Sequence, residues 1–264
     1  MRPSSSFFAS KFLPAIAMLA VLSACAGNNA DSILVPDEPV DALYTKGSDA
    51  LERGEYKEAA KQFSEVDRQH PYSTWATKAQ LMEAYAYYED MNYDEAIKAL
   101  DQFIELHPGS NDISYAYYLR ALSNYERILD VRRDQTSARE ALKGLKEIVS
   151  RFADTEYAKD ATLKIALIND HLAGAEMEVG RYYIKQRLYI SAIGRFKTVI
   201  DKYQTTSHVP EALERLVECY AALGMTGEAK KNAAILGHNF PGSAWYQDAY
   251  KLLQKKGVAT EGKR

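Results

Sequence analysis

The sequence predicts an all-α protein: a solenoid of five helical hairpins closed by a final helix. Alanine occurs 37 times, whereas valine, isoleucine and threonine together occur 36 times. This balance favours helix over sheet, because β-branched residues are the natural strand formers and alanine is the best helix former. A composition that is 47% hydrophobic and 26% charged is that of a folded globular protein. In addition, one pattern of small and apolar residues recurs five times along the chain.

Residues 1–24 have the features of a secretory signal. Arg2 and Lys11 are their only charges, and residues 12–24 form a mainly apolar run. This run is too short to cross a bilayer, which takes roughly 20 apolar residues. Residues 22–25, Leu-Ser-Ala-Cys, look like a bacterial lipobox, in which the cysteine becomes the lipidated N-terminus. We predict a lipoprotein signal peptide at 1–24 and acyl chains such as palmitate on Cys25. The alternative is a plain signal peptide with an accidental cysteine.

Residues 25–40 are predicted to form a lipidated, flexible tether, because they are mostly polar and contain prolines. Lipoproteins held in the inner membrane often carry Asp after the cysteine, and Ala26 therefore predicts an outer-membrane destination. Removal of the signal takes away two positive charges, so the formal charge changes from −3 to −5. An acidic protein of this kind does not bind nucleic acid by neutralising phosphates.

A short motif begins at Pro71, Pro108, Ala153, Gln204 and Pro241, with Ser or Thr two residues later and Ala eight residues later. A small residue lies twelve positions before each motif, and apolar residues lie eight and five positions before it. Spacings of three and four place residues on one helical face. The Ser or Thr is expected to cap the first helix of the next hairpin. This pattern is typical of tetratricopeptide repeats (TPR), helical hairpins of about 34 residues.

The motifs are 37, 45, 51 and 37 residues apart, and the two longer spacings need an explanation. The first surplus coincides with a charged loop at residues 130–135. The second contains no helix breaker, so residues 155–187 are predicted to form one helix of about 33 residues, roughly 50 Å long. A helix at 243–255 would cap the solenoid. The predicted parts are an N-terminal TPR half with the start of repeat three (41–130), a C-terminal TPR half with the cap (131–255) and a flexible tail (256–264).

The sequence shows no catalytic motif. HExxH, CxxC, GxSxG and GxGxxG are absent, and the five histidines are scattered or repeat-equivalent. Cys219 lies in a helical run without a neighbouring histidine, which favours a packing role. TPR solenoids mostly bind other molecules. We therefore predict a binding scaffold and not an enzyme, with no metal site and no cofactor other than the lipid on Cys25.

Tyrosine is unusually common, with 19 residues against 8 Phe and 2 Trp. Five tyrosines fall on first-helix positions that line the groove of a TPR solenoid: Tyr44, Tyr85, Tyr88, Tyr118 and Tyr125. They could form an aromatic groove for a partner, because Tyr offers a large contact area at little cost in conformational entropy. Any single one of them fits packing between helices slightly better, with its hydroxyl at the surface, but for the set an aromatic groove is the better account. We interpret the neighbouring Glu89 and Glu126 as solvated charges.

Two stretches of the sequence are distinctive, residues 171–183 (HLAGAEMEVGRYY) and 191–196 (SAIGRF). Together with residues 85–88, 133–135 and 235–243, they carry a family resemblance. In these stretches the chain resembles the BamD family, the TPR lipoproteins of the outer-membrane β-barrel assembly machinery. The long helix, the five repeats and the lipobox also fit this family. One departure is that Ala153 and Gln204 replace the repeat proline in repeats three and four.

The resemblance implies a lipid-anchored protein on the periplasmic face of the outer membrane. Its partners would be the POTRA region of BamA, other Bam lipoproteins and unfolded outer-membrane β-barrel proteins, with no nucleic acid. The N-terminal repeats would receive the C-terminal signal strand of the unfolded barrels. Arg195 would pair with an acidic residue of BamA, and Tyr182 and Tyr183 would belong to the same surface.

Two alternatives remain open at this point. A periplasmic TPR lipoprotein that coordinates another envelope machine, either pilotin-like or in cell-wall coordination, would share the anchor and the repeats. The enzyme alternative is a cell-wall lytic protein with a helical solenoid. It would need a separate catalytic domain, and the 240 residues left after removal of the signal provide no room for one beside five repeats.

Overall fold

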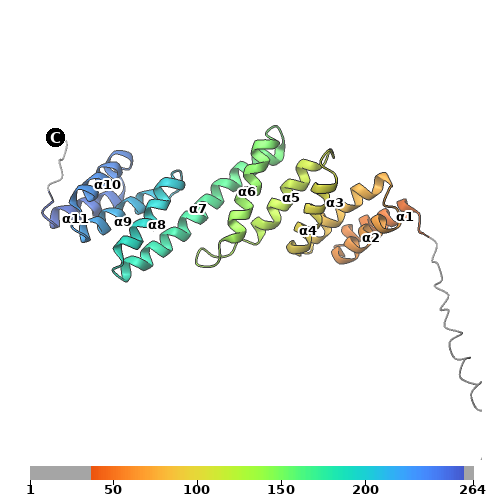
Figure 1. The fold of residues 1–264 in the computed structure, drawn as a ribbon, viewed down its shortest axis with the longest axis horizontal. Coiled ribbons are helices and arrows are strands. Elements are labelled where there is room, and N and C mark those ends of the chain that lie inside the picture. Colours follow the sequence, from red (N-terminus) through yellow and green to blue (C-terminus); the bar gives the residue numbers. More distant parts are fainter. Residues whose placement is uncertain (1–36, 259–264) are drawn as a thin grey trace, which may run out of the picture. The chain divides into compact units, whose positions relative to one another are not determined.

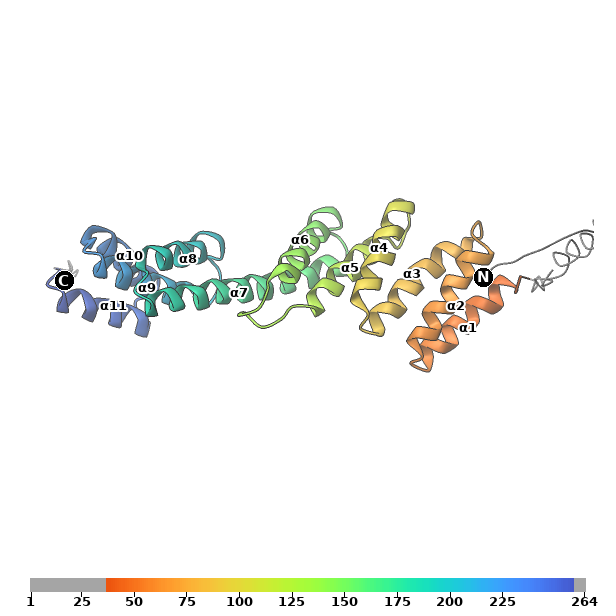
Figure 2. The same cartoon turned by 60° about the horizontal axis from the view of Figure 1, so that its bottom comes forward.

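The computed structural model describes residues 37–258, and within this range all regular structure is helical (Figures 1 and 2). Five helical hairpins follow one another along the chain and a last helix completes them: α1 (Val40–Glu52), α2 (Tyr56–Gln69), α3 (Thr74–Glu89), α4 (Tyr93–Leu106), α5 (Ile113–Glu126), α6 (Thr136–Arg151), α7 (Glu156–Lys185), α8 (Tyr189–Lys202), α9 (Val209–Ala222), α10 (Thr226–Asn239) and α11 (Ala244–Lys255). The helices α1 to α10 pack chiefly against their neighbours in chain order, and α11 packs on α9 and α10. The predicted all-α TPR solenoid is therefore confirmed.

Several predictions concern parts of the chain outside the described residues. These are the signal peptide at 1–24, the lipid on Cys25, most of the tether and the tail after residue 258. The boundary between the predicted halves falls in the loop between α5 and α6 and stays a prediction. Among residues 37–258, no helix combines the length and the apolar character needed to cross a membrane.

The repeat positions identified in the sequence form the core. The small residues at the two conserved positions are completely buried: Ala59, Ala96, Ala141, Ala192 and Ala229, then Ala79, Ala116, Ala161, Ala212 and Ala249. Phe63 and Phe196, at equivalent positions of repeats one and four, are also fully buried. Each of these rings lies against a glycine of the preceding helix. A Cβ on Gly47 would lie 2.8 Å from Phe63, and one on Gly180 would overlap Phe196. Small residues thus allow the two helices of a hairpin to cross closely.

The helix starts agree with the predicted caps at three of five places. Ser73, Thr155 and Ser243 each accept a hydrogen bond from the backbone N–H three residues later. The prediction is wrong at Ser110 and Thr206, because α5 and α9 begin three residues further on. At Ser110 the side chain accepts from the N–H of Asp112 in a turn that precedes the helix.

The later start of α9 has a physical reason in Pro210. Proline lacks a backbone N–H and is tolerated in the first turn of a helix, where that donor would have no partner. A start at Val209 places Pro210 in this first turn.

In four of the five hairpins, the turn between the two helices has the same conformation. Gly54, Met91, Arg187 and Gly224 all have a positive φ, between 57° and 74°. The N–H of the next residue then bonds back to a carbonyl of the first helix, as Asn92 does with Tyr87 at 2.9 Å. Two of the four positions lack glycine, although the left-handed conformation disfavours side chains by about 1–2 kcal/mol.

The prediction of a long first helix in repeat four is confirmed. α7 contains 30 residues, which at 1.5 Å per residue is roughly 45 Å. Its first half, with Ala161 and Ile168, belongs to a hydrophobic cluster shared with α5 and α6. Its second half, with Ala173 and Met177, belongs to the cluster shared with α8 to α11. One uninterrupted helix therefore takes part in the cores of both neighbouring groups of helices.

Candidate partner-binding surfaces

The first candidate site is a surface of tyrosines on the first helices of repeats two, three and four. We call it the aromatic surface, and its members are Tyr85, Tyr88, Tyr115, Tyr118 and Tyr157. All five are half-buried. The rings of Tyr118 and Tyr157 stack with centroids 5.0 Å apart, and Tyr115 lies 5.6 Å from Tyr157. Tyr85, Tyr88 and Tyr115 pack against one hydrophobic cluster, so helices α3, α5 and α7 bring together tyrosines from three repeats.

The local sequence explains how α3 presents its tyrosines. Ala84 and Ala86 are completely buried, whereas Tyr85 and Tyr88 remain at the surface. Three residues apart on a helix, these two rings lie on the same face. Small residues thus pack inward and leave the aromatic rings at the edge of the core, where one side of each ring stays accessible.

The hydroxyls and nearby carboxylates give the aromatic surface a negative character. Tyr118 donates a hydrogen bond to Oδ2 of Asp160 at 2.5 Å. Burial raises the pKa of Tyr88 to about 12, and the charges of Glu126 and Glu89 add to this rise. Burial alone would raise the pKa of Asp160, but hydrogen bonds from Tyr118 and Lys164 lower it. At neutral pH the Tyr88 hydroxyl therefore stays protonated, while the Asp160 carboxylate is charged.

Two of the five tyrosines singled out in the sequence lie apart from this cluster. Tyr44 packs in the first repeat, with its ring 5.3 Å from Phe63 and 4.8 Å from Trp75. The ammonium of Lys78 lies 5.6 Å from the centre of the Tyr44 ring. Tyr125, near the end of α5, lines a pocket with α7. The structure thus brings Tyr85, Tyr88 and Tyr118 together, and it adds Tyr115 and Tyr157, which the first-helix pattern missed.

The second candidate site surrounds Arg195 on α8. Phe196 points into the core, and the Arg195 side chain is 44% exposed, as one residue of helical rotation predicts. Its Nη1 lies 3.1 Å from Oε2 of Glu176 on α7. This hydrogen bond raises the pKa of Arg195; burial opposes the rise, and the Tyr183 hydroxyl adds to it. The structure thus gives Arg195 a partner within the chain, which the sequence did not predict.

Tyr182 and Tyr183 accompany Arg195 from the end of α7. Their ring centroids are 5.9 Å apart, and Tyr182 is 58% exposed whereas Tyr183 packs against the C-terminal core. Tyr183 also interacts with the Arg195 guanidinium. An exposed ring, a half-buried ring and a guanidinium therefore form one surface, which we call the Arg195 surface.

A network of ion pairs lies on the neighbouring helices of the C-terminal half. Nη1 of Arg181 lies 3.0 Å from both carboxylate oxygens of Glu211, and its Nη2 lies 2.5 Å from Glu178. Arg215 extends the network from Glu211 to Glu218. These ion pairs join α7 to α9 and so help to fix the positions of the helices around the Arg195 surface relative to one another.

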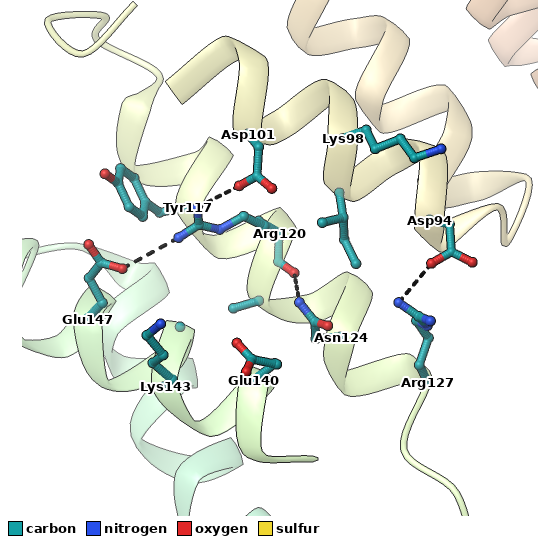
Figure 3. A pocket seen from close by; sticks show the side chains of 13 residues that line it. Asp94, Lys98, Asp101, Tyr117, Arg120, Asn124, Arg127, Glu140, Lys143 and Glu147 are labelled. Atoms are coloured by element: carbon teal, nitrogen blue, oxygen red, sulfur yellow. Dashed lines mark hydrogen bonds and ion pairs between the residues drawn. The ribbon is translucent and has the colours of Figure 1, made fainter. Parts of the chain in front are cut away.

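A charged cleft that was not predicted from the sequence lies between α4, α5 and α6 (Figure 3). Its volume is about 570 Å³. Arg120 bridges Asp101 at 2.8 Å and Glu147 at 3.4 Å, and Arg127 pairs with Asp94 at 3.0 Å. These ion pairs between acidic and basic side chains link repeats two and three across the cleft.

The remaining chemistry is that of a folded scaffold. Within residues 37–258, no three His, Cys, Asp or Glu side chains gather as they would around a metal ion. Cys219 is completely buried, and burial raises the pKa of its thiol to about 12. A neutral, inaccessible thiol is a packing group, as predicted.

Comparison with known proteins covers nearly the whole chain. The sequence model of a family described as YfiO, outer membrane lipoprotein, matches residues 36–236. The outer membrane protein assembly factor BamD of Caulobacter vibrioides is 51% identical over 93% of this chain and 82% of the relative. BamD of Rickettsia prowazekii is 44% identical, over 92% and 97% of the two chains. BamD of Neisseria meningitidis is 34% identical, over 91% and 95%.

Solved structures of helical-repeat proteins align at much lower identity. The TPR2AB-domain:pHSP90 complex of yeast Sti1 aligns at 12% identity over 83% of each chain, with a TM-score of 0.46.

Proposed function

The chain belongs to the outer membrane lipoprotein family of the BamD assembly factors, and from this premise we propose how its two surfaces serve the assembly of outer-membrane proteins. Its relatives are named assembly factors, which agrees with the expectation of a non-enzymatic scaffold. The Arg195 surface is the docking site for the POTRA region of BamA. The aromatic surface receives the C-terminal signal strand of unfolded β-barrel proteins. Other Bam lipoproteins are further partners.

The observation that carries this proposal is the contrast between the two surfaces. The Arg195 surface offers an exposed guanidinium and an exposed ring on helices that ion pairs hold together. A guanidinium can grip a carboxylate with two parallel hydrogen bonds, which suits a fixed, specific partner. The aromatic surface offers several rings of similar character, which suit many related peptide strands.

Anchoring is assigned to Cys25, whose acyl chains would hold the protein on the periplasmic face of the outer membrane. Each buried methylene contributes about 0.8 kcal/mol, so several chains anchor stably. Cys25→Ser should leave the protein uncleaved or released from the outer membrane. Membrane fractionation tests this, and normal outer-membrane recovery of the variant would contradict the lipoprotein assignment.

The docking proposal is tested by affinity purification of the full-length protein from detergent-solubilised outer membranes. We expect a POTRA-containing barrel protein to copurify with the parent and to be lost with Arg195→Glu. Lys197→Glu is the matched control, because it reverses an exposed charge two residues away on the same helix. Full recovery with Arg195→Glu would remove Arg195 from the docking site.

The ion pair with Glu176 allows a finer test of the same site. If Arg195 exchanges Glu176 for a carboxylate of the partner, Glu176→Gln should preserve or strengthen docking. Arg195→Lys should retain only part of the affinity, because an ammonium cannot form the paired hydrogen bonds of a guanidinium. If Glu176→Gln weakened docking as much as Arg195→Glu, the intact ion pair, and not a free guanidinium, would be the docking element.

A further inference from the structure

A pocket lies between the end of α5 and the middle of α7. Its volume is about 430 Å³. Apolar side chains and one histidine line most of it: Tyr125, Ile128, Leu129, Leu167, Ile168 and His171. We call it the α5–α7 pocket, and it adjoins the aromatic surface through α5, since Tyr118 and Tyr125 lie on the same helix.

The walls of this pocket expose large apolar side chains. Leu129 is 52% exposed and Leu167 is 59% exposed. Leu163, one turn before Leu167 on α7, is 68% exposed. Single exposed leucines are common on protein surfaces, but a group of them around a hollow marks an interaction site. The pocket is therefore suited to an apolar side chain from another molecule.

A buried polar atom without a partner lies in the same place. Nε2 of His171 is inaccessible to solvent and has no hydrogen-bond partner within residues 37–258. The great majority of buried side-chain polar atoms have such a partner. His171 lines the pocket, but its Nε2 is inaccessible, so a bound polypeptide would contact the accessible part of the ring and not this nitrogen.

The charge at the rim points to the chemistry of that polypeptide. Glu126 lines the pocket, and no ion pair joins it to a cation among the described residues. Burial raises the pKa of Tyr88 and Tyr93, and the nearby charges of Glu126 and Glu89 add to this rise. The nearby Lys164 is already paired with Asp160 at 3.0 Å. A basic group of a ligand can therefore gain both a carboxylate and adjacent aromatic rings.

We propose that the α5–α7 pocket holds an apolar side chain of an extended client segment, while a basic side chain of the same segment pairs with Glu126. This rests on the proposed function and names the chemistry of the client strand. Tyr118 and Tyr125 are seven positions apart and therefore lie roughly 10 Å apart along the helix, a distance that about three extended residues cover. One strand can therefore occupy the aromatic surface and the pocket together. Glu126 then determines specificity, beyond its initial interpretation as a solvated charge.

The test measures peptide binding to the full-length, lipidated protein in detergent. Three fluorescent peptides copy the C-terminal strand of an outer-membrane barrel protein and differ only two residues before the C-terminal aromatic, where they carry Lys, Gln or Glu. That position is on the same face of an extended strand as the aromatic. The parent should bind the Lys peptide at least fivefold more tightly than the Glu peptide.

Two variants separate the apolar and the charged contributions. Leu167→Asp should weaken all three peptides at least fivefold, whereas Ile190→Asp, at a more exposed apolar residue of α8, should not change them. Glu126→Gln should abolish the preference for Lys and leave the Gln peptide unaffected. Circular dichroism of each variant verifies that the helices are intact.

The outcomes distinguish the inference from the proposed function. If the parent binds the peptides and both variants match it, the pocket proposal is overturned while peptide reception stands. If the parent binds none of the peptides, peptide reception fails and the pocket proposal fails with it. A dimer of the parent that Leu167→Asp dissociates would show that a second copy of the chain occupies the pocket, which also overturns the proposal.

Discussion

The aromatic surface and the Arg195 surface are built on the same repeat but differ in how their polar groups are satisfied. Around Arg195, the main charged side chains are paired within the chain, as Arg195 is with Glu176 and Arg181 with Glu211. Around the aromatic surface, Glu126 remains without an ion pair among the described residues. A paired network positions one group for one partner, whereas half-buried rings and a single carboxylate without an ion pair tolerate many related partners. The difference shows how one repeat can support both specific docking and broad reception.

The comparison assumes that the two halves of the solenoid have the same kind of hydrophobic core. Truncation of the equivalent phenylalanines tests this assumption, and it should have the largest effect on stability. Phe63→Ala and Phe196→Ala should each lower the free energy of unfolding by about 3–5 kcal/mol, because both rings are completely buried. Chemical denaturation of each variant measures the loss. A small effect at one position only would show that the two hairpins are not equivalent.

The division of labour predicts opposite binding defects in two variants. Arg195→Glu should weaken binding to the BamA POTRA region by about 2–5 kcal/mol and leave peptide binding intact. Tyr85→Ala combined with Tyr118→Ala should weaken peptide binding and leave BamA binding intact. Titrations with both ligands measure this.

The double tyrosine variant needs a structural control, because the rings also pack on the core. Loss of helicity together with peptide binding would show that these tyrosines serve packing. Unchanged helicity with unchanged peptide affinity would remove them from the site.

The pH dependence of stability should differ between the halves because of Glu214 on α9. Burial raises the pKa of this carboxyl from 4.5 to about 7, although Arg215 opposes the rise. The folded state then binds more protons than the unfolded state, so stability falls as pH rises from about 4.5 through 7. One pKa unit is about 1.4 kcal/mol, so the full cost above pH 7 is on the order of 3 kcal/mol.

The replacement Glu214→Gln should remove most of this dependence. Thermal melting at pH 5 and pH 8 measures it, with the parent melting at a lower temperature at pH 8 and the variant changing little. Identical pH profiles for the two proteins would show that Glu214 is charged in the folded state at little cost.

The smallest expected effect on stability concerns the close crossing of α7 and α8 near the Arg195 surface. Two glycines, one on each helix, provide a matched pair for alanine substitution. Gly180→Ala should destabilise the protein by about 1–3 kcal/mol, because a Cβ there overlaps Phe196. Gly194→Ala should stabilise it by roughly 0.5–1 kcal/mol, since that helical position has open space around it. Denaturation of the two variants measures both signs. Equal effects would mean that the α7–α8 crossing adjusts to the added methyl group.

The sequence alone determined the helices, their pairing into hairpins and the residues that pack between them. The burial of Ala96, Ala192 and their equivalents follows from spacings within about twenty residues, and local spacing is what sets a helix face. The long helix α7 was predictable for the same reason, because its extra residues contain no breaker. The late start of α9 also has a local cause in the sequence, because Pro210 explains it.

Only the tertiary structure decided which side chains meet across helices. The pairing of Arg195 with Glu176, the separation of Tyr44 from the other tyrosines, and the α5–α7 pocket all depend on contacts between separate elements. Helical periodicity places a side chain on a face, but it does not say which residue of the next helix that side chain touches. That choice depends on crossing distances set by small residues such as Gly180, and these appear only once the helices are packed.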